Sequence, residues 1–104
     1  MAKVSFQYAC GTLLARLAGE IDHHSAEMLR REIDTRLDRS TIEHLCLDFG
    51  DVGFMDSSGI GLILGRERRI RAMNGRLTVA QPPEQIRKIL DIAGIGYIPK
   101  EDKP

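Results

Sequence analysis

The sequence predicts a single α/β domain in which a small mixed β-sheet packs with helices. Apolar and polar residues alternate in two short runs near the N-terminus, which is the pattern of two half-buried strands. Three later segments carry apolar residues at helical spacing, and short apolar runs separate them. The resulting order, strand, strand, helix, strand, helix, strand, helix, predicts an N-terminal antiparallel hairpin followed by parallel strands with helical crossovers.

Length and charge limit the possible functions. The 104 residues suit one domain, residues 1–104, whose charged tail over 99–104 is expected to fray. Fifteen basic and fifteen acidic side chains balance, so nothing favours nucleic acid or a membrane surface as the partner. No apolar run is long enough to span a membrane. We therefore expect a soluble, cytoplasmic protein whose two cysteines, Cys10 and Cys46, stay reduced.

The first three elements follow from short-range patterns. Val4–Tyr8 and Leu13–Leu17 alternate as strands do, and Cys10-Gly11 supplies the tight turn between them. A helix is predicted from Ser25 onward because apolar residues then recur at steps of three and four. Its buried face is expected to hold Ala26, Leu29, Ile33 and Leu37.

The later elements surround a central strand. Leu45–Leu47 is a run of consecutive apolar residues, which predicts a strand that is covered on both faces and has a parallel neighbour. The elements after it are a helix that opens at Ser57-Ser58 and ends at Asn74-Gly75, a strand over 77–80, and a helix between Pro82-Pro83 and Gly94.

The stretch FMDSSGIGLILGR, residues 54–66, holds the candidate functional residues. A catalytic serine needs a base within hydrogen-bond reach, and the nucleophile elbow G-x-S-x-G is absent. The imidazole bases on offer are His23, His24 and His44, and nothing in the spacing ties one of them to a serine. We therefore predict no catalytic residue, although a serine-dependent enzyme or phosphocarrier stays open as an alternative.

The glycines of this stretch do not form a nucleotide-binding loop. Gly59 and Gly61 begin a G-x-G-x-x-G pattern, but Leu64 occupies its last position, and no Lys-Ser or Lys-Thr follows as a P-loop requires. We expect no cofactor. Glycine is unfavourable within a helix, which indicates instead that these two residues let the helix pack closely on its sheet.

Two interpretations of the serines remain. An aspartate and a serine at a helix start are typical of simple capping, and Asp56 with Ser57 suffices for that purpose. Ser58 is then a spare hydroxyl in the first helical turn, where a phosphate would sit at the favourable end of the helix dipole. A regulatory phosphorylation site at Ser58 is the hypothesis that accounts for this residue.

Two other groups of residues have ordinary explanations. His44 and Cys46 share one face of a strand, but two potential ligands do not make a zinc site, so we predict no metal. A cluster of arginines with Glu67 indicates a solvated helix face, and its functional use would be to meet an acidic partner. The arginines are Arg66, Arg68, Arg69 and Arg71.

Three segments together resemble the STAS-domain anti-sigma-factor antagonists, specifically those of the stage-II sporulation type. They are GEIDHHSAE at residues 19–27, FMDSSGIGLILGR at 54–66 and ILDIAGIG at 89–96. The resemblance covers roughly residues 4–98, and the pair His23-His24 after Asp22 favours the sporulation branch. Family members usually carry a further helix beyond the last of these segments.

The resemblance implies a binding protein and no enzyme. It implies that this chain binds a nucleotide-loaded anti-sigma factor that is also a serine kinase, and so frees a sporulation sigma factor. The kinase would phosphorylate Ser58, a metal-dependent serine phosphatase would reverse this, and the free protein would be a monomer. The residues implied around the site are Asp22, Asp56, Ser57, Gly59, Ile60 and Gly61. A STAS signalling module of a non-sporulation partner-switching system is the alternative within the family.

Overall fold

A computed structural model describes residues 1–99 of the chain, which form one mixed sheet and three helices. The elements are β1 (Ala2–Ala9), β2 (Thr12–Ile21), α1 (His23–Arg39), β3 (His44–Met55), α2 (Ser57–Ala72), β4 (Arg76–Ala80) and α3 (Glu84–Ala93). Their order confirms the predicted one. The tail expected to fray lies, from residue 100 onward, outside the described residues.

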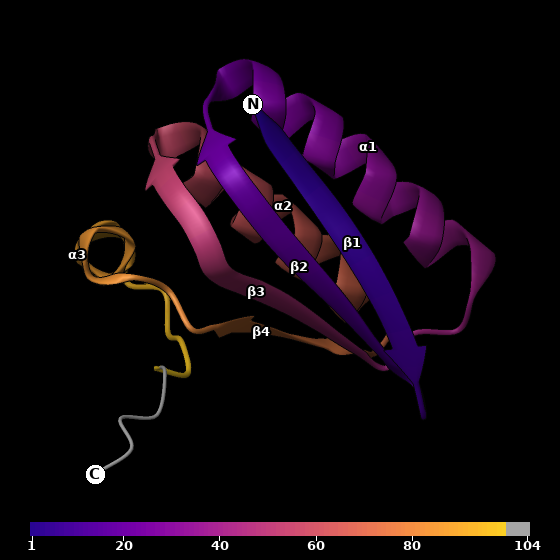
Figure 1. The fold of residues 1–104 in the computed structure, drawn as a ribbon. Coiled ribbons are helices and arrows are strands. Elements are labelled where there is room, and N and C mark those ends of the chain that lie inside the picture. The colour runs from indigo at the N-terminus through magenta and orange to yellow at the C-terminus, as the bar shows by residue number, and fades with distance from the viewer. Residues whose placement is uncertain (100–104) are drawn as a thin grey trace, which may run out of the picture.

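The four strands lie in the order β1-β2-β3-β4 (Figure 1). β1 and β2 are antiparallel, whereas β2, β3 and β4 are mutually parallel, as predicted. Ala9 pairs with Thr12, so Cys10 and Gly11 form a two-residue turn, and their φ angles are 51° and 81°. Positive φ at both central residues matches the twist of the flanking strands, which explains the tight hairpin.

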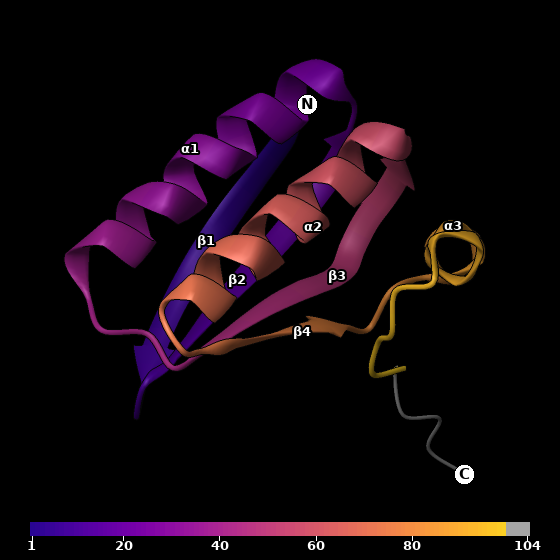
Figure 2. The ribbon, with the colours of Figure 1, turned by 180° about the vertical axis from the view of Figure 1, so that it is seen from behind.

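Both long helices cover the same face of the sheet, where α1 and α2 lie side by side (Figure 2). The core lies between these helices and the sheet. Leu29 and Ile33 of α1 and Leu45 and Leu47 of β3 are fully buried in it. α3 lies beyond β4 and buries Ile86 and Leu90.

The prediction that the central strand is covered on both faces was wrong. Leu45 and Leu47 are fully buried, but His44 and Cys46, on the opposite face, are only half-buried. The parallel strands follow one another in a single direction across the sheet, and right-handed crossovers then place both connecting helices on one face. The other face of β1–β3 is left without a covering helix (Figure 1).

The helix ends agree with the sequence signals. Asn74 takes the left-handed conformation just after α2, with φ 62°, and Gly94 does so after α3, with φ 73°. Both cysteines are free thiols, as predicted, with Cys10 exposed and Cys46 half-buried. None of the helices within residues 1–99 combines the length and apolar character that a membrane span requires.

Candidate functional site

The site is built where two strands end and two helices begin. β2 and β3 are parallel, and their last residues, Ile21 and Met55, are paired. The next residue in each segment, Asp22 and Asp56, is the N-cap of the following helix. The backbone N–H of Asp56 donates to the carbonyl of Ile21 at 3.1 Å, so the two helix starts are held side by side.

Each aspartate caps its helix with its own carboxylate. Asp22 Oδ1 accepts from the backbone N–H of Ser25, and Asp56 Oδ1 accepts from that of Ser58, both at 2.8 Å. The Ser25 N–H stabilises the ionised carboxylate and therefore lowers the pKa of Asp22. The cap predicted at Asp56 is confirmed, whereas Ser57 is the exposed first residue of α2 and not the cap.

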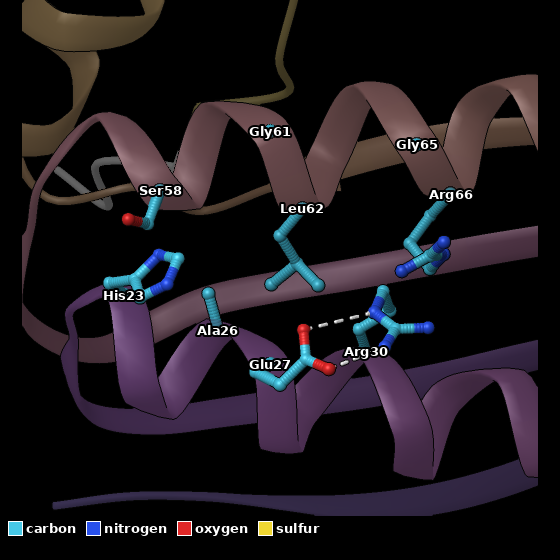
Figure 3. A pocket seen from close by; sticks show the side chains of 9 residues that line it. All are labelled: His23, Ala26, Glu27, Arg30, Ser58, Gly61, Leu62, Gly65 and Arg66. Atoms are coloured by element: carbon cyan, nitrogen blue, oxygen red, sulfur yellow. Dashed lines mark hydrogen bonds and ion pairs between the residues drawn. The ribbon is translucent and has the colours of Figure 1, made fainter.

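Ser58 is half-buried and lines a groove of about 320 Å³ between α1 and α2. His23, the first residue of α1, lines the same end of the groove, where its ring and the Ser58 side chain are neighbours (Figure 3). The exposed histidine next to it, His24, lines a different pocket with Met1 and Met28. The fold therefore brings one of the three candidate imidazoles to the groove that Ser58 lines.

A network of ion pairs closes the other end of the groove. Arg30 donates to Glu27 at 2.6 Å, and its guanidinium lies 3.7 Å from the Asp34 carboxylate. Arg66 Nε lies 3.0 Å from Asp34 Oδ1, but the N–H is not aimed at the oxygen, so this contact is an ion pair without a hydrogen bond. Burial lowers the pKa of Arg66, and the charge of Asp34 partly opposes that shift.

The predicted solvated arginine face is wrong at Arg66. Its side chain is only 9% exposed because it points into the space between the two helices. Arg69 also turns toward α1, where it pairs with Asp34 at 3.2 Å and with Asp38. Arg68 is exposed, as predicted. Arg71 is exposed and pairs with Glu67 at 3.5 Å.

The two candidate glycines differ in their surroundings. A Cβ on Gly59 would collide with the buried side chain of Met55, which confirms close packing of α2 at that position. Gly61 is exposed, and a Cβ there would meet nothing within 4 Å. The close approach predicted at Gly61 is therefore wrong, since its side of the helix faces the open groove. Ile60, between them, is half-buried and packs against the core.

Residues 4–100 match the STAS domain family. The chain belongs to this family. It is 36% identical over 96 residues to the anti-sigma F factor antagonist of Paenibacillus polymyxa, a match spanning 92% of this chain and 82% of the relative. This likeness confirms the resemblance seen in the sequence.

Solved structures support the same conclusion. The structure of the anti-sigma factor antagonist SpoIIAA in its unphosphorylated form matches with a TM-score of 0.84 at 32% identity, covering 96% of this chain and 90% of that one. The phosphorylated form of the Bacillus cell fate determinant SpoIIAA matches with a TM-score of 0.76, also at 32% identity, and covers 96% and 93%. The α/β fold of this STAS domain is thus that of SpoIIAA.

The STAS fold gathers most of the predicted site residues at one end of the molecule. Asp22, Asp56, Ser57 and Ser58 lie at the paired helix starts, and Gly61 lies one turn further along the groove. His44 is not among them, since it lies on the uncovered face of the sheet with a 2.6 Å hydrogen bond to Thr78.

Three residues of the groove were not among the predicted site residues: His23, Arg30 and Arg66. A signal for the first was present. Ile21-Asp22 and Met55-Asp56 repeat the same order of apolar residue and cap, and parallel strands that end in register bring such caps together. The inward direction of Arg66 had no comparable signal, because arginine is typical of exposed helix faces.

Proposed function

We propose that this STAS domain is a sporulation-type anti-sigma factor antagonist, which binds an anti-sigma factor through the surface around Ser58 and is switched off by phosphorylation there. The observation that carries the proposal is the position of Ser58. It lies in the first turn of α2 and lines a groove, in a chain similar over 92% of its length to an anti-sigma F factor antagonist. Binding the anti-sigma factor would free the sigma factor that it holds.

The contact surface is proposed to surround Ser58 at the paired helix starts. Asp22, Ser57 and Gly61 are exposed, and Asp56 and Ile60 are half-buried, so a partner can reach all five. Gly59 is buried against Met55, so a partner does not reach it. Its role is to let α2 approach the end of β3 closely. The open space beside Gly61 and Gly65 leaves room for the active site of another protein.

Phosphorylation requires a kinase and its reversal requires a phosphatase. In the forward step the Ser58 hydroxyl oxygen bonds to the γ-phosphorus of ATP, ADP leaves, and the hydroxyl proton passes to a base of the kinase. We propose the nucleotide-loaded anti-sigma factor itself as the kinase. A metal-dependent serine phosphatase would then hydrolyse the phosphoserine and restore binding.

The physical basis of the switch is electrostatic. A phosphoserine carries about −1.5 to −2 charges. In the free protein the dipole of α2 favours that charge by roughly 0.3 to 1 kcal/mol, while the nearby Asp56 carboxylate opposes it. The fold should therefore survive. At an interface, an uncompensated buried charge costs about 2 to 5 kcal/mol. Phosphorylation should therefore dissociate the complex with the anti-sigma factor.

Site mapping tests the proposal. The anti-sigma factor encoded in the same genome is incubated with this protein and ATP, and phosphopeptides are identified by mass spectrometry. One phosphate on Ser58 is expected, retained in Ser57→Ala and lost in Ser58→Ala. A phosphate on Ser57 or outside the site would contradict the assignment, and labelling by ATP without the kinase would favour the enzyme or phosphocarrier instead.

A further inference from the structure

We propose that His23 stabilises the phosphorylated state: its imidazole binds the phosphate on Ser58 across the groove between α1 and α2. The inference rests on the proposed function in one respect, the assignment of Ser58 as the phosphorylated residue. It extends that function by making the first turn of α1 part of the switch.

The geometry places the two side chains on opposite walls of one groove. Ser58 comes from the first turn of α2 and His23 from the first turn of α1, and both line the same end of the groove (Figure 3). The Asp56-to-Ile21 hydrogen bond fixes the two helix starts relative to one another. Ser58 is half-buried, and its side chain projects from α2 into the groove that α1 borders on the other side.

The charged groups around Ser58 leave this role to His23. The carboxylates of Asp22 and Asp56 are each engaged by a backbone N–H at 2.8 Å. Glu27, one turn along α1 from His23, is paired with Arg30 at 2.6 Å and with Arg31 at 3.4 Å. Arg66 lies at the far end of the groove and is paired with Asp34.

His23, by contrast, is exposed, and among residues 1–99 its ring has no hydrogen bond or ion pair. Histidine gains its positive charge between pH 5 and 8, and a charged ring donor forms a short, strong hydrogen bond to a phosphate oxygen. An imidazolium beside the phosphate favours the dianion over the monoanion. The second proton of the phosphoserine, whose ordinary pKa is about 6, should therefore leave at a lower pH.

The chain contains a matched control for this effect. His24 follows His23 directly and is also exposed, but it lines a pocket with Met1, Ala2, Ser25 and Met28 instead of the groove. A long-range effect of positive charge on the pKa of the phosphate would be similar for both histidines. A direct contact with the phosphate is proposed for His23 alone.

The test uses the full chain with phosphoserine installed at position 58 during translation, so that no kinase is needed. The ³¹P chemical shift is followed from pH 4.5 to 8 in the wild type, His23→Gln, His24→Gln and His23→Lys. The midpoint should rise by roughly half a pH unit to one unit in His23→Gln, stay unchanged in His24→Gln, and remain low in His23→Lys. Equal midpoints in the wild type and His23→Gln, or equal rises in both Gln variants, would overturn the proposal.

A second measurement covers the case in which His23→Gln does not fold. In the wild type, the ring ¹⁵N signals of His23 should change when Ser58 carries phosphate, while those of His24 do not; unchanged His23 signals would also overturn the inference. The two proposals fail separately. A kinase that labels another residue removes the proposed function and leaves the ³¹P result intact, whereas labelling of Ser58 with no His23 effect removes only the inference.

Discussion

The backbone N–H of Asp56 donates a 3.1 Å hydrogen bond to the carbonyl of Ile21, and this bond joins the start of α2 to the end of β2. Because β2 and β3 end in register, α1 and α2 begin next to each other at one edge of the sheet. Ser58, in the first turn of α2, therefore lies near the start of α1, and its backbone N–H donates to the capping Asp56 carboxylate.

The Asp22 cap of α1 should make the free energy of unfolding depend on pH. The Ser25 N–H lowers the pKa of Asp22 below the usual 3.8. The ionised carboxylate therefore adds to the free energy of unfolding above pH 3.8, and this contribution is lost as the pH falls through the lower pKa of the folded state. Asp22→Asn keeps a capping acceptor but cannot titrate. Urea unfolding should show the wild type more stable than the variant at pH 7, by a margin that shrinks near pH 3. A margin independent of pH would contradict this role for Asp22.

The two glycines of α2 should respond oppositely to alanine. A methyl group at Gly59 meets the buried Met55 side chain, so Gly59→Ala should destabilise the fold by about 1 to 3 kcal/mol through overpacking. The position of Gly61 is open, so Gly61→Ala should stabilise it by up to about 1 kcal/mol through helix propensity. Chemical denaturation of both variants measures this. Equal effects of alanine at the two positions would contradict the claim that Gly59 is closely packed and Gly61 is not.

The ion pairs between α1 and α2 should matter far more than an exposed carboxylate on α1. Asp34 is the carboxylate that faces Arg66 at 3.0 Å and Arg69 at 3.2 Å, and Arg66 is buried. Asp34→Ala leaves that buried charge without its partner, which should lower the free energy of unfolding by roughly 3 kcal/mol. Glu32 is exposed on the same helix, and Glu32→Ala should change it by less than about 0.5 kcal/mol. Similar losses in the two variants would contradict the account.

Local patterns in the sequence predicted the order of the elements and several of their ends. The hairpin turn at Cys10-Gly11 and the left-handed stop at Asn74 depend on residues next to one another in the chain, and both are present. The coverage of β3 could not be read in the same way. It depends on which face the crossovers take, and three apolar residues in a row at Leu45–Leu47 misled because Cys46 lies on the uncovered face.

The candidate site was predictable to the extent that it is local. The cap at Asp56 and the place of Ser58 in the first turn of α2 follow from adjacent residues. His23 reaches Ser58 only because β2 and β3 are neighbours that end in register, which is a tertiary relationship. Arg66 and Gly61 were misassigned for a related reason, since a sequence shows helical periodicity but not which part of a helix faces a neighbouring helix.

The central claim, that charge at Ser58 ends binding without disturbing the fold, is tested most directly by calorimetric titration of the ATP-loaded anti-sigma factor with Ser58→Asp. Circular dichroism and thermal melting of the variant should match the wild type, because the helix dipole and Asp56 act on the new charge in opposite directions. Its affinity should fall by roughly thirtyfold to several thousandfold, the equivalent of about 2 to 5 kcal/mol, while Ser58→Ala binds as the wild type does. Wild-type affinity in Ser58→Asp, or loss of its fold, would contradict the electrostatic switch.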